Sequence, residues 1–290
     1  MKNNILNVIK TKMPEMSKGQ KRISDYILNH YDKAAYMTAS KLGEVAGVSE
    51  STVVRYAIEL GFDGYPELVH TLQEAVRSVL TSVQRIEVTD ERIGTANVLE
   101  KTLLSDIVKI KATLECNDNE NFDLIINDII NAKNIYIAGA RASSMLAEML
   151  SYNLNLIFDN VRHIDTAIES NIFEQMLRIN KEDVLIAITF PRYSKRIIKT
   201  VAFARENNAR IIGITDSESS PIAANSDRLL FAQSDMASYM DSLVAPLSLI
   251  NAIVVAISRK KKDELSGIFD RLEKVWDEYE VYEKDSGNNV

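Results

Sequence analysis

The spacing of apolar residues predicts a helical first part of the chain, followed by a part in which strands and helices alternate. Behind a capping box formed by Ser17 and Gln20, apolar residues recur at helical spacing from Ile23 to Tyr31. Further helical stretches run from about residue 66 to 83 and from 99 to 110. The polar run 117–121 is typical of a boundary, so we place the start of the second domain at about Phe122.

Residues 38–56 read as two short helices hinged at Gly47, the layout of a DNA-reading helix-turn-helix. Ser49 can cap the second helix through its hydroxyl. We expect the apolar residues of that helix to face the domain core, namely Val53, Val54, Ala57, Ile58 and Leu60. The candidate DNA-binding residues are Thr38, Ser49, Ser51, Thr52, Arg55 and Tyr56. The alternative is an ordinary helical hairpin, because Gly and Ser commonly punctuate helices.

A longer string narrows this choice. Residues 47–56 read Gly-Val-Ser-x-x-Thr-Val-x-Arg-Tyr, and residues 60–68 read Leu-Gly-Phe-x-Gly-Tyr-x-Glu-Leu. Together with the Thr that precedes an Ala/Leu-rich helix, the run from about Ser17 to Leu72 resembles the N-terminal domain of the RpiR family of bacterial transcription regulators. The resemblance implies a double-stranded DNA operator as partner.

The second part repeats a strand–helix pattern. We expect strands at 134–138, 161–164, 183–189, 210–215 and 228–231, and helices at 144–156, 194–207 and 243–257. Such repetition predicts a parallel sheet covered by helices on both faces. The fold class is therefore an all-α helix-turn-helix domain followed by an α/β domain with a flavodoxin-like five-stranded sheet of order 2-1-3-4-5.

Two loops join a strand end to a helix start at equivalent places, 139–144 and 189–195. In the order 2-1-3-4-5 they flank the topological switch point, where open parallel sheets bind ligands, and a helix N-terminus there favours an anion. The alternative is that Ser143 and Ser194 only cap helices while Arg141 and Arg192 are solvated.

The strings Ile-Thr-Phe-Pro-Arg-Tyr-Ser at 188–194 and Ile-Ile-Gly-Ile-Thr-Asp-Ser at 211–217 resemble the sugar isomerase (SIS) domain, over about Phe122 to Arg259. This resemblance implies a phosphosugar effector held by the hydroxyls of Ser143, Thr189 and Ser194. Ser144, Arg141, Arg192 and Lys195 are further candidate ligands. Arg141 stands where many SIS loops have a second Gly, and Pro191-Arg192 replaces a Ser-Gly pair.

Composition and charge limit the remaining possibilities. The chain has 290 residues, of which 46% are hydrophobic, and a net charge of −7. Residues 1–77 hold ten Lys/Arg against nine Asp/Glu, and the remainder holds 24 against 32, so the acidity belongs to the second part. The basic residues that can face DNA phosphates are Lys10, Lys12, Lys18, Lys21, Arg22, Lys41 and Arg55.

We expect no cofactor, because the loop at 139–143 lacks the three glycines of a dinucleotide site. One cysteine, Cys116, and three scattered histidines give no reason to expect a disulfide or a metal site. The chain has no apolar run long enough to cross a membrane, so we expect a cytoplasmic protein.

We divide the chain into a helix-turn-helix domain (1–77), a helical connector (78–121), the SIS domain (122–262), and a C-terminal helix and tail (263–290). This organisation favours a transcriptional regulator of sugar or aminosugar metabolism that senses a phosphosugar without catalysis. One alternative is a sugar-phosphate isomerase or aminosugar-processing enzyme with an appended helical domain. His163, Glu148 and Glu169 are its candidate bases, and none is compelling. Another is a DNA-binding dimer that has lost its ligand.

We also expect a homodimer or homotetramer, because one reading helix covers too little DNA for specificity. The C-terminal helix carries an apolar stripe that either folds back on its own sheet or packs against a partner subunit. Its members are Leu265, Phe269, Leu272, Trp276 and Tyr279.

Overall fold

The computed structural model describes residues 5–77, 80–94 and 96–283. These residues form two compact units. Unit 1 holds the described chain up to Lys109 together with two later segments, Pro191–Tyr193 and Ser234–Leu243. Unit 2 holds most of the chain from Ile110 onward.

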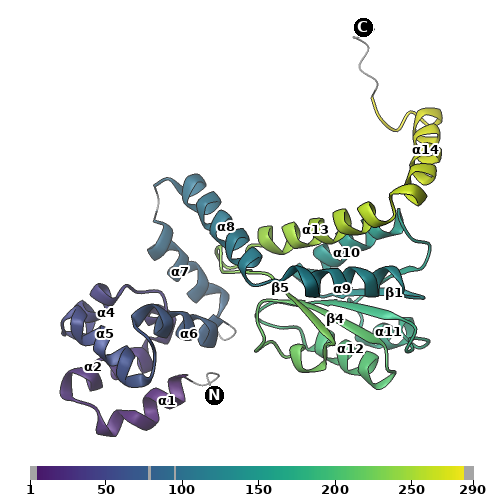
Figure 1. The fold of residues 1–290 in the computed structure, drawn as a ribbon. Coiled ribbons are helices and arrows are strands. Elements are labelled where there is room, and N and C mark those ends of the chain that lie inside the picture. The colour runs from purple at the N-terminus through teal and green to yellow at the C-terminus, as the bar shows by residue number, and fades with distance from the viewer. Residues whose placement is uncertain (1–4, 78–79, 95, 284–290) are drawn as a thin grey trace. The chain divides into compact units, whose positions relative to one another are not determined.

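Unit 1 is helical (Figure 1). Its elements are α1 (Ile5–Lys12), η1 (Met13–Glu15), α2 (Lys18–Asn29), α3 (Tyr31–Ala34), α4 (Ala39–Ala46), α5 (Glu50–Leu60), α6 (Tyr65–Arg77), α7 (Ser82–Ile93) and the first part of α8 (Val98–Glu115). The predicted capping box of Ser17 and Gln20 is present at the start of α2. The stretch expected to be helical from 66 to 83 is instead divided, because α6 ends at Arg77 and Thr81 opens α7 with a capping box of its own.

The core of unit 1 consists of one face from each of several short helices. Fully buried apolar side chains come from α2 (Ile23, Ile27), α4 (Leu42), α5 (Val53) and α6 (Leu68). Ile23 and Ile27 lie four residues apart and therefore on one face of α2, as in an amphipathic helix. Burying one such side chain stabilises the fold by roughly 1.5–3 kcal/mol, so the cluster fixes the arrangement of helices within the unit.

Unit 2 is a parallel sheet between helices (Figure 1). Its elements are the end of α8, α9 (Asn119–Ile130), β1 (Ile135–Gly139), α10 (Ala142–Asn155), β2 (Val161–Ile164), α11 (Glu169–Gln175), β3 (Val184–Ile188), α12 (Lys195–Glu206), β4 (Arg210–Thr215), η2 (Ala223–Asn225), β5 (Arg228–Phe231), α13 (Val244–Lys260) and α14 (Lys262–Glu278). The strand order β2-β1-β3-β4-β5 confirms the predicted topology.

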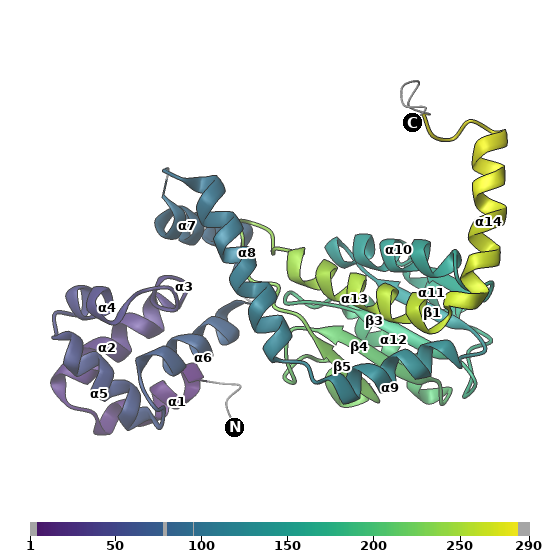
Figure 2. The ribbon, with the colours of Figure 1, turned by 45° about the horizontal axis from the view of Figure 1, so that its top comes forward.

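The sheet is covered on both faces. Figures 1 and 2 show α9, α10 and α13 on one face and α11 and α12 on the other. Every residue of β1 and β3 is buried, which explains why these strands read as unbroken apolar runs rather than as alternating ones. The switch point lies between β1 and β3, because the chain goes from β1 to β2 on one side and then returns to β3 on the other.

The C-terminal helix does not fold back on the sheet. Figures 1 and 2 show α14 pointing away from it. Of the predicted apolar stripe only Leu265 is buried, while Tyr279 just beyond the helix is 72% exposed. Residues 284–290 of the predicted tail lie outside the described residues. Among the helices that the structure describes, none is both long and apolar enough to span a membrane.

Candidate functional site

Both helices of the helix-turn-helix begin with a side-chain N-cap. Thr38 caps α4, and its Oγ1 accepts a hydrogen bond from the backbone N of Lys41 at 3.2 Å. Gly47 ends α4 in the left-handed conformation, with φ 65°. Ser49 then caps α5, and its Oγ accepts from the backbone N of Thr52 at 3.3 Å. The sequence therefore specifies both the turn and the start of the second helix.

The turn is packed too closely to accept larger residues. A Cβ placed on Gly43 would lie 2.9 Å from the carbonyl oxygen of Val48, an approach that only a glycine allows. Because Val48 follows the turn directly, this contact holds α4 against the start of α5. The close approach of Gly43 to Val48 thus fixes the turn between α4 and α5.

The outer face of α5 is polar at its N-terminal end. Ser51 and Arg55 are exposed, and Thr52 is half-buried. The Oγ of Ser49 lies 2.9 Å from the Oγ of Ser51 and 2.8 Å from the Oγ1 of Thr52. Nε of Arg55 donates to the Ser51 carbonyl at 3.4 Å, which leaves the rest of the guanidinium at the surface. These side chains can reach base edges or phosphates in a major groove.

Two expectations for α5 are wrong. Tyr56, a candidate DNA-binding residue, is fully buried, and its hydroxyl lies 2.9 Å from the Ser24 hydroxyl. Burial raises the pKa of Tyr56 to about 12. Ile58, expected in the core, is 54% exposed. The physical reason is the helical period: one face of α5 is filled by Val53, Tyr56, Ala57 and Leu60, and Ile58 falls outside it.

One basic residue near the reading helix is already paired. Nζ of Lys41, on α4, forms an ion pair with the Glu44 carboxylate at 2.9 Å. The hydrogen bond to Glu44 raises the pKa of Lys41. Lys41 remains exposed, so a DNA phosphate would have to compete with Glu44 for its ammonium group.

The second candidate site lies at the carboxyl ends of β1 and β3. These strands pair in parallel with Gly139 opposite Ile188, so the loops that follow them leave the sheet side by side. One loop leads into α10 on one face, and the other leads into α12 on the opposite face. This geometry places Thr189, which follows Ile188, next to the turn that carries Ser143.

The backbone of both loops is strained at the positions where the sequence departs from the SIS pattern. Arg141 has φ 58° and ψ −128°, and Arg192 has φ 62°. Positive φ values are uncommon for residues other than glycine and raise the energy of the chain. The loops thus keep a glycine-like backbone although arginine occupies both positions.

The turn before α10 is also crowded. A Cβ placed on Gly139 would lie 2.2 Å from the carbonyl oxygen of Ser143, so no other residue fits there without moving the backbone. The Gly139 carbonyl accepts a hydrogen bond from the buried Oγ1 of Thr166 at 2.8 Å. Arg196 on α12 in turn donates to the Thr166 carbonyl at 2.7 Å. Neither Thr166 nor Arg196 was expected at this site. Thr166 lies two residues beyond the end of β2, and Thr189 lies directly after β3, so both are near strand ends.

Of the three hydroxyl residues predicted to bind the ligand, two are buried and the third stands at the start of α12. Ser143 is 7% exposed and Thr189 is 2% exposed. Ser194 occupies the N-cap of α12, yet its side chain makes no capping hydrogen bond. The capping alternative therefore does not describe Ser194.

The remaining candidates have other roles or none assigned by contact. Oγ of Ser144 donates to the Arg141 carbonyl at 2.6 Å and so closes the turn itself. The Arg192 guanidinium donates to the Ser82 Oγ at 3.4 Å. Arg141 and Lys195 are exposed.

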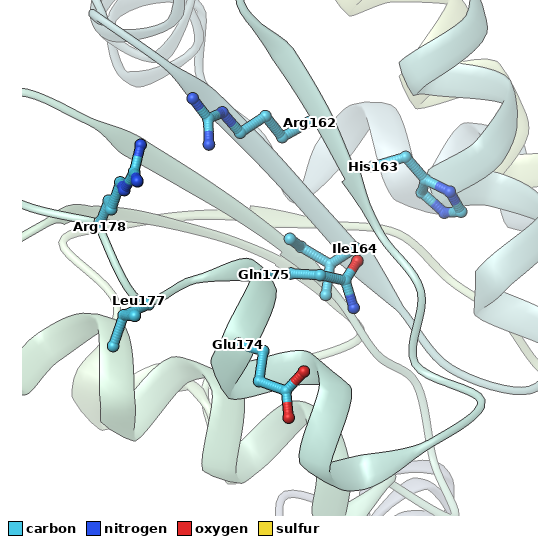
Figure 3. A pocket seen from close by; sticks show the side chains of 7 residues that line it. All are labelled: Arg162, His163, Ile164, Glu174, Gln175, Leu177 and Arg178. Atoms are coloured by element: carbon cyan, nitrogen blue, oxygen red, sulfur yellow. The ribbon is translucent and has the colours of Figure 1, made fainter.

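A hollow of about 470 Å³ lies elsewhere, at the β2 edge of the sheet (Figure 3). It is lined by Arg162, His163, Ile164, Glu174, Gln175, Leu177 and Arg178. Neither strand-end loop contributes to it. Figure 3 shows the His163 ring and the Glu174 carboxylate pointing in different directions, so they do not form an acid–base pair. The hydrogen bond from Lys199 lowers the pKa of Glu169, which makes that carboxylate a weaker base.

Comparisons with known proteins agree with this architecture. Residues 3–78 match the helix-turn-helix domain of the rpiR family, and residues 128–256 match the SIS domain. An HTH-type transcriptional regulator of Clostridium perfringens is 30% identical over 230 residues, which cover 77% of this chain and 79% of that protein. The transcriptional regulator HexR of Pseudomonas aeruginosa is 23% identical over 269 residues, 89% of this chain and 90% of HexR.

Two solved structures share the fold. The Vibrio vulnificus NanR protein complexed with ManNAc-6P has a TM-score of 0.58 at 20% identity, covering 94% of this chain and 98% of NanR. The sugar isomerase domain of an RpiR transcription factor from Sphaerobacter thermophilus has a TM-score of 0.57 at 20% identity, covering 60% of this chain and 97% of that domain. With its capped helix-turn-helix and its five-stranded parallel sheet, the chain belongs to the RpiR family of helix-turn-helix transcriptional regulators with a SIS domain.

Proposed function

We propose that this regulator binds a phosphosugar at the carboxyl ends of β1 and β3 and changes its affinity for an operator in response. The observation that carries the proposal is the pair of adjacent strand-end loops, strained at Arg141 and Arg192, with buried hydroxyls at Ser143 and Thr189. Strained backbone concentrates at ligand-binding sites, and the switch point of a parallel sheet is where such ligands bind. NanR, which shares the fold, is a protein complexed with ManNAc-6P.

The phosphate group would take hydrogen bonds from the hydroxyls of Ser143, Thr189 and Ser194. Ser194 supports this assignment because its hydroxyl makes no capping bond at the start of α12. Arg141 and Lys195 are exposed beside these hydroxyls in the chain and supply positive charge to the same group. Ser144 contributes through the turn that it closes rather than through a free hydroxyl.

DNA would be read by the outer face of α5. Ser51, Thr52 and Arg55 supply the contacts to base edges or phosphates, and Thr38 and Ser49 supply the helix starts whose backbone N–H groups can face phosphates. Tyr56 acts from the core by holding α5 in place. Operator recognition by one such helix is weak, so we propose that two copies bind a two-fold symmetric site.

We propose binding without catalysis. Aldose–ketose isomerisation needs a base of suitable pKa beside the substrate carbon. Glu169 has a lowered pKa through Lys199, and His163 lines the hollow at β2 rather than the strand-end loops. The division of labour follows: 1–77 read DNA, 78–121 connect, 122–262 sense the ligand and 263–290 form the C-terminal segment. We place the protein in the cytoplasm, where an operator is accessible.

The test is a thermal-shift screen of the full chain against a panel of sugar phosphates that includes N-acetylmannosamine 6-phosphate. A ligand at 100 times its Kd raises stability by roughly 2.7 kcal/mol, because it binds only the folded state. The hit is then tested in an operator-binding assay. We expect the double variant Ser143→Ala/Ser194→Ala to lose the shift and the response while it keeps its ligand-free DNA affinity.

The matched control is Ser266→Ala, which removes an exposed hydroxyl on α14 that donates to the Lys262 carbonyl one turn earlier in the same helix. An equal response in the double variant and the wild type contradicts the assignment of these hydroxyls. Conversion of the sugar phosphate into a product during the assay supports the enzyme alternative instead.

A further inference from the structure

Helix α8 differs from an ordinary surface helix, because polar side chains lie on its buried side and apolar side chains lie on its exposed side. Lys109 and Thr113 are each 6% exposed. Nζ of Lys109 lies 3.2 Å from the Asp106 carboxylate, which accepts a further hydrogen bond from Ser242 at 2.7 Å. The Oγ1 of Thr113 accepts from the backbone N of Gln233 at 2.9 Å.

The polar side continues beyond the helix and closes the edge of the sheet. The Asn117 side-chain amide donates to the Phe231 carbonyl at 2.7 Å and accepts from the Phe231 N at 2.9 Å, as a neighbouring strand would. Asn121 donates to the Leu229 carbonyl at 2.9 Å. An exposed strand edge invites pairing with other chains, so this polar cover of β5 serves the fold. It also fixes which side of α8 faces outward.

The outward side is apolar. Leu103, Leu104, Ile107 and Val108 are 55%, 54%, 56% and 65% exposed. They lie at spacings of three and four residues and form one contiguous face, which we call the α8 seam. Leu99 and Leu114 extend it at either end and are 76% and 75% exposed. A helix that buries its polar side and exposes its leucines is incomplete without a partner.

The charges at the ends of the α8 seam indicate what that partner is. Glu100 lies just before Leu103 and Lys111 lies just after Val108, and both are exposed. In an antiparallel pair of α8 helices, Glu100 of each copy lies opposite Lys111 of the other, and Leu104 lies opposite Ile107. A parallel pair would instead bring Glu100 against Glu100 and Lys111 against Lys111.

We propose that two copies of this chain associate through the α8 seam, with their α8 helices antiparallel. The pattern is self-complementary under a two-fold axis between residues 105 and 106, as an isologous interface requires. The proposal rests on the two-fold assembly proposed above and names its surface. It also makes the connector, rather than α14, the element that sets how the two copies are joined.

The first test places a charge in the seam of the full-length protein. Leu104→Asp is compared with Leu177→Asp, since Leu177 is an exposed leucine of unit 2, at 74%, outside the α8 seam. In sedimentation equilibrium we expect Leu104→Asp to raise the dimer dissociation constant by at least about 100-fold, because an unpaired charge would be buried. Leu177→Asp should leave it unchanged. A dimer that tolerates Leu104→Asp overturns the proposal.

The second test uses charge reversal, which is independent of folding defects. Glu100→Lys and Lys111→Glu each create two like-charge contacts and should weaken the dimer by about tenfold. The double variant Glu100→Lys/Lys111→Glu restores opposite charges and should recover the wild-type dissociation constant. An equimolar mixture of the two single variants should form a heterodimer in preference to either homodimer.

The outcomes separate the seam from the proposed function. A wild-type protein that stays monomeric at all concentrations contradicts the two-fold assembly itself. A wild-type dimer that is indifferent to both the Leu104→Asp and the charge-reversal variants leaves the regulator intact and overturns the α8 seam. Weakening by both single reversals without recovery in the double variant shows that the helices are not antiparallel in this register, and also overturns the proposal.

Discussion

The helix-turn-helix and the strand-end loops of the SIS domain both contain residues with a positive φ, but the residue types at these positions differ. In unit 1 the chain takes a positive φ at Gly47 and at Gly61, where glycine adopts it without strain. In the SIS domain the loops that follow β1 and β3 take a positive φ at Arg141 and at Arg192. The backbone of the helix-turn-helix is therefore unstrained at these positions, whereas the loops at the switch point have a backbone conformation that arginine disfavours.

This difference in backbone strain bears on ligand binding. A residue forced into a sparsely populated backbone region costs on the order of 1–3 kcal/mol, and glycine would remove that cost. The guanidinium of an arginine at such a position can bind a phosphate group through two parallel hydrogen bonds, which glycine cannot do. The turns on either side of α5, by contrast, contain glycine and hold the helix without backbone strain.

The largest expected effect comes from Gly139, which ends β1 and begins the loop that leads into α10. In Gly139→Ala the new Cβ would meet the Ser143 carbonyl at 2.2 Å, so the start of α10 has to move. We expect a loss of about 3 kcal/mol or more in the free energy of unfolding of the SIS domain, measured by chemical denaturation.

Gly267→Ala is the control for Gly139→Ala. Gly267 lies within α14 with no heavy atom within 4 Å of its Cβ position, so alanine there should be neutral or should stabilise the helix by about 1 kcal/mol. If Gly139→Ala is as stable as the wild type, the crowding of the first loop is not what fixes its shape.

The next prediction concerns Arg55 and tests whether the outer face of α5 binds DNA. Arg55→Ala removes the one long cationic side chain on the outer face of α5, so specific operator affinity should fall by about 1–3 kcal/mol if the guanidinium contacts a base. Fluorescence anisotropy with operator DNA measures this change. Arg178→Ala, at the β2 hollow, is the matched control and should bind DNA like the wild type. Unchanged affinity in a folded Arg55→Ala protein removes Arg55 from the interface.

The elements that the sequence predicted well are those in which one physical signal dominates. The strand 161–164 was placed to the residue, and the order of the sheet followed from the alternation of strands and helices. The caps at Ser17 and Ser49 were also correct, because a capping hydroxyl acts within three residues of the chain. Such local signals need no knowledge of the rest of the fold.

The misses lie where the partner of a side chain is distant in sequence. Helical spacing placed Leu103 and Ile107 on one face of a helix but gave no indication that this face points outward. The outward orientation depends on Asn117 and Thr113 binding the chain near residues 231–233, more than 100 residues away. Similarly, the Arg55-Tyr56 pair in the motif gave no sign that Tyr56 packs against Ser24 in the core.

A smaller effect follows from the burial of Tyr56, which helps to hold α5 in place. Tyr56→Phe removes the hydroxyl that bonds Ser24, so stability should fall by about 1 kcal/mol while operator affinity stays unchanged. Since burial raises the folded-state pKa of Tyr56 from 10.0 to about 12, the neutral phenol stabilises the fold fully below pH 10. That contribution is lost as the pH rises toward about 12.

The measurement is the free energy of unfolding of wild type and Tyr56→Phe between pH 8 and 12. The wild type should lose more stability than the variant above pH 10, so that the two curves converge. A Tyr56→Phe protein with normal stability and weakened DNA binding would return Tyr56 to the DNA interface and contradict its place in the core.

The smallest expected effect comes from Arg141→Gly. This variant tests the comparison directly, because it places in the loop after β1 the residue type found at the positive-φ positions of the helix-turn-helix. At φ 58° and ψ −128°, Arg141 occupies a region in which glycine is preferred, as at the first central position of a type II′ turn. Arg141→Gly should raise the free energy of unfolding by about 1 kcal/mol, the strain relieved less the extra freedom of glycine in the unfolded chain. The same variant should respond more weakly to the sugar phosphate. Asn208→Gly is the control at another positive φ, 61°, and should change stability less because asparagine tolerates that region. If Arg141→Gly stabilises the protein and leaves the response intact, the strain at the switch point is unrelated to ligand binding, and the contrast between the two turns has no functional meaning.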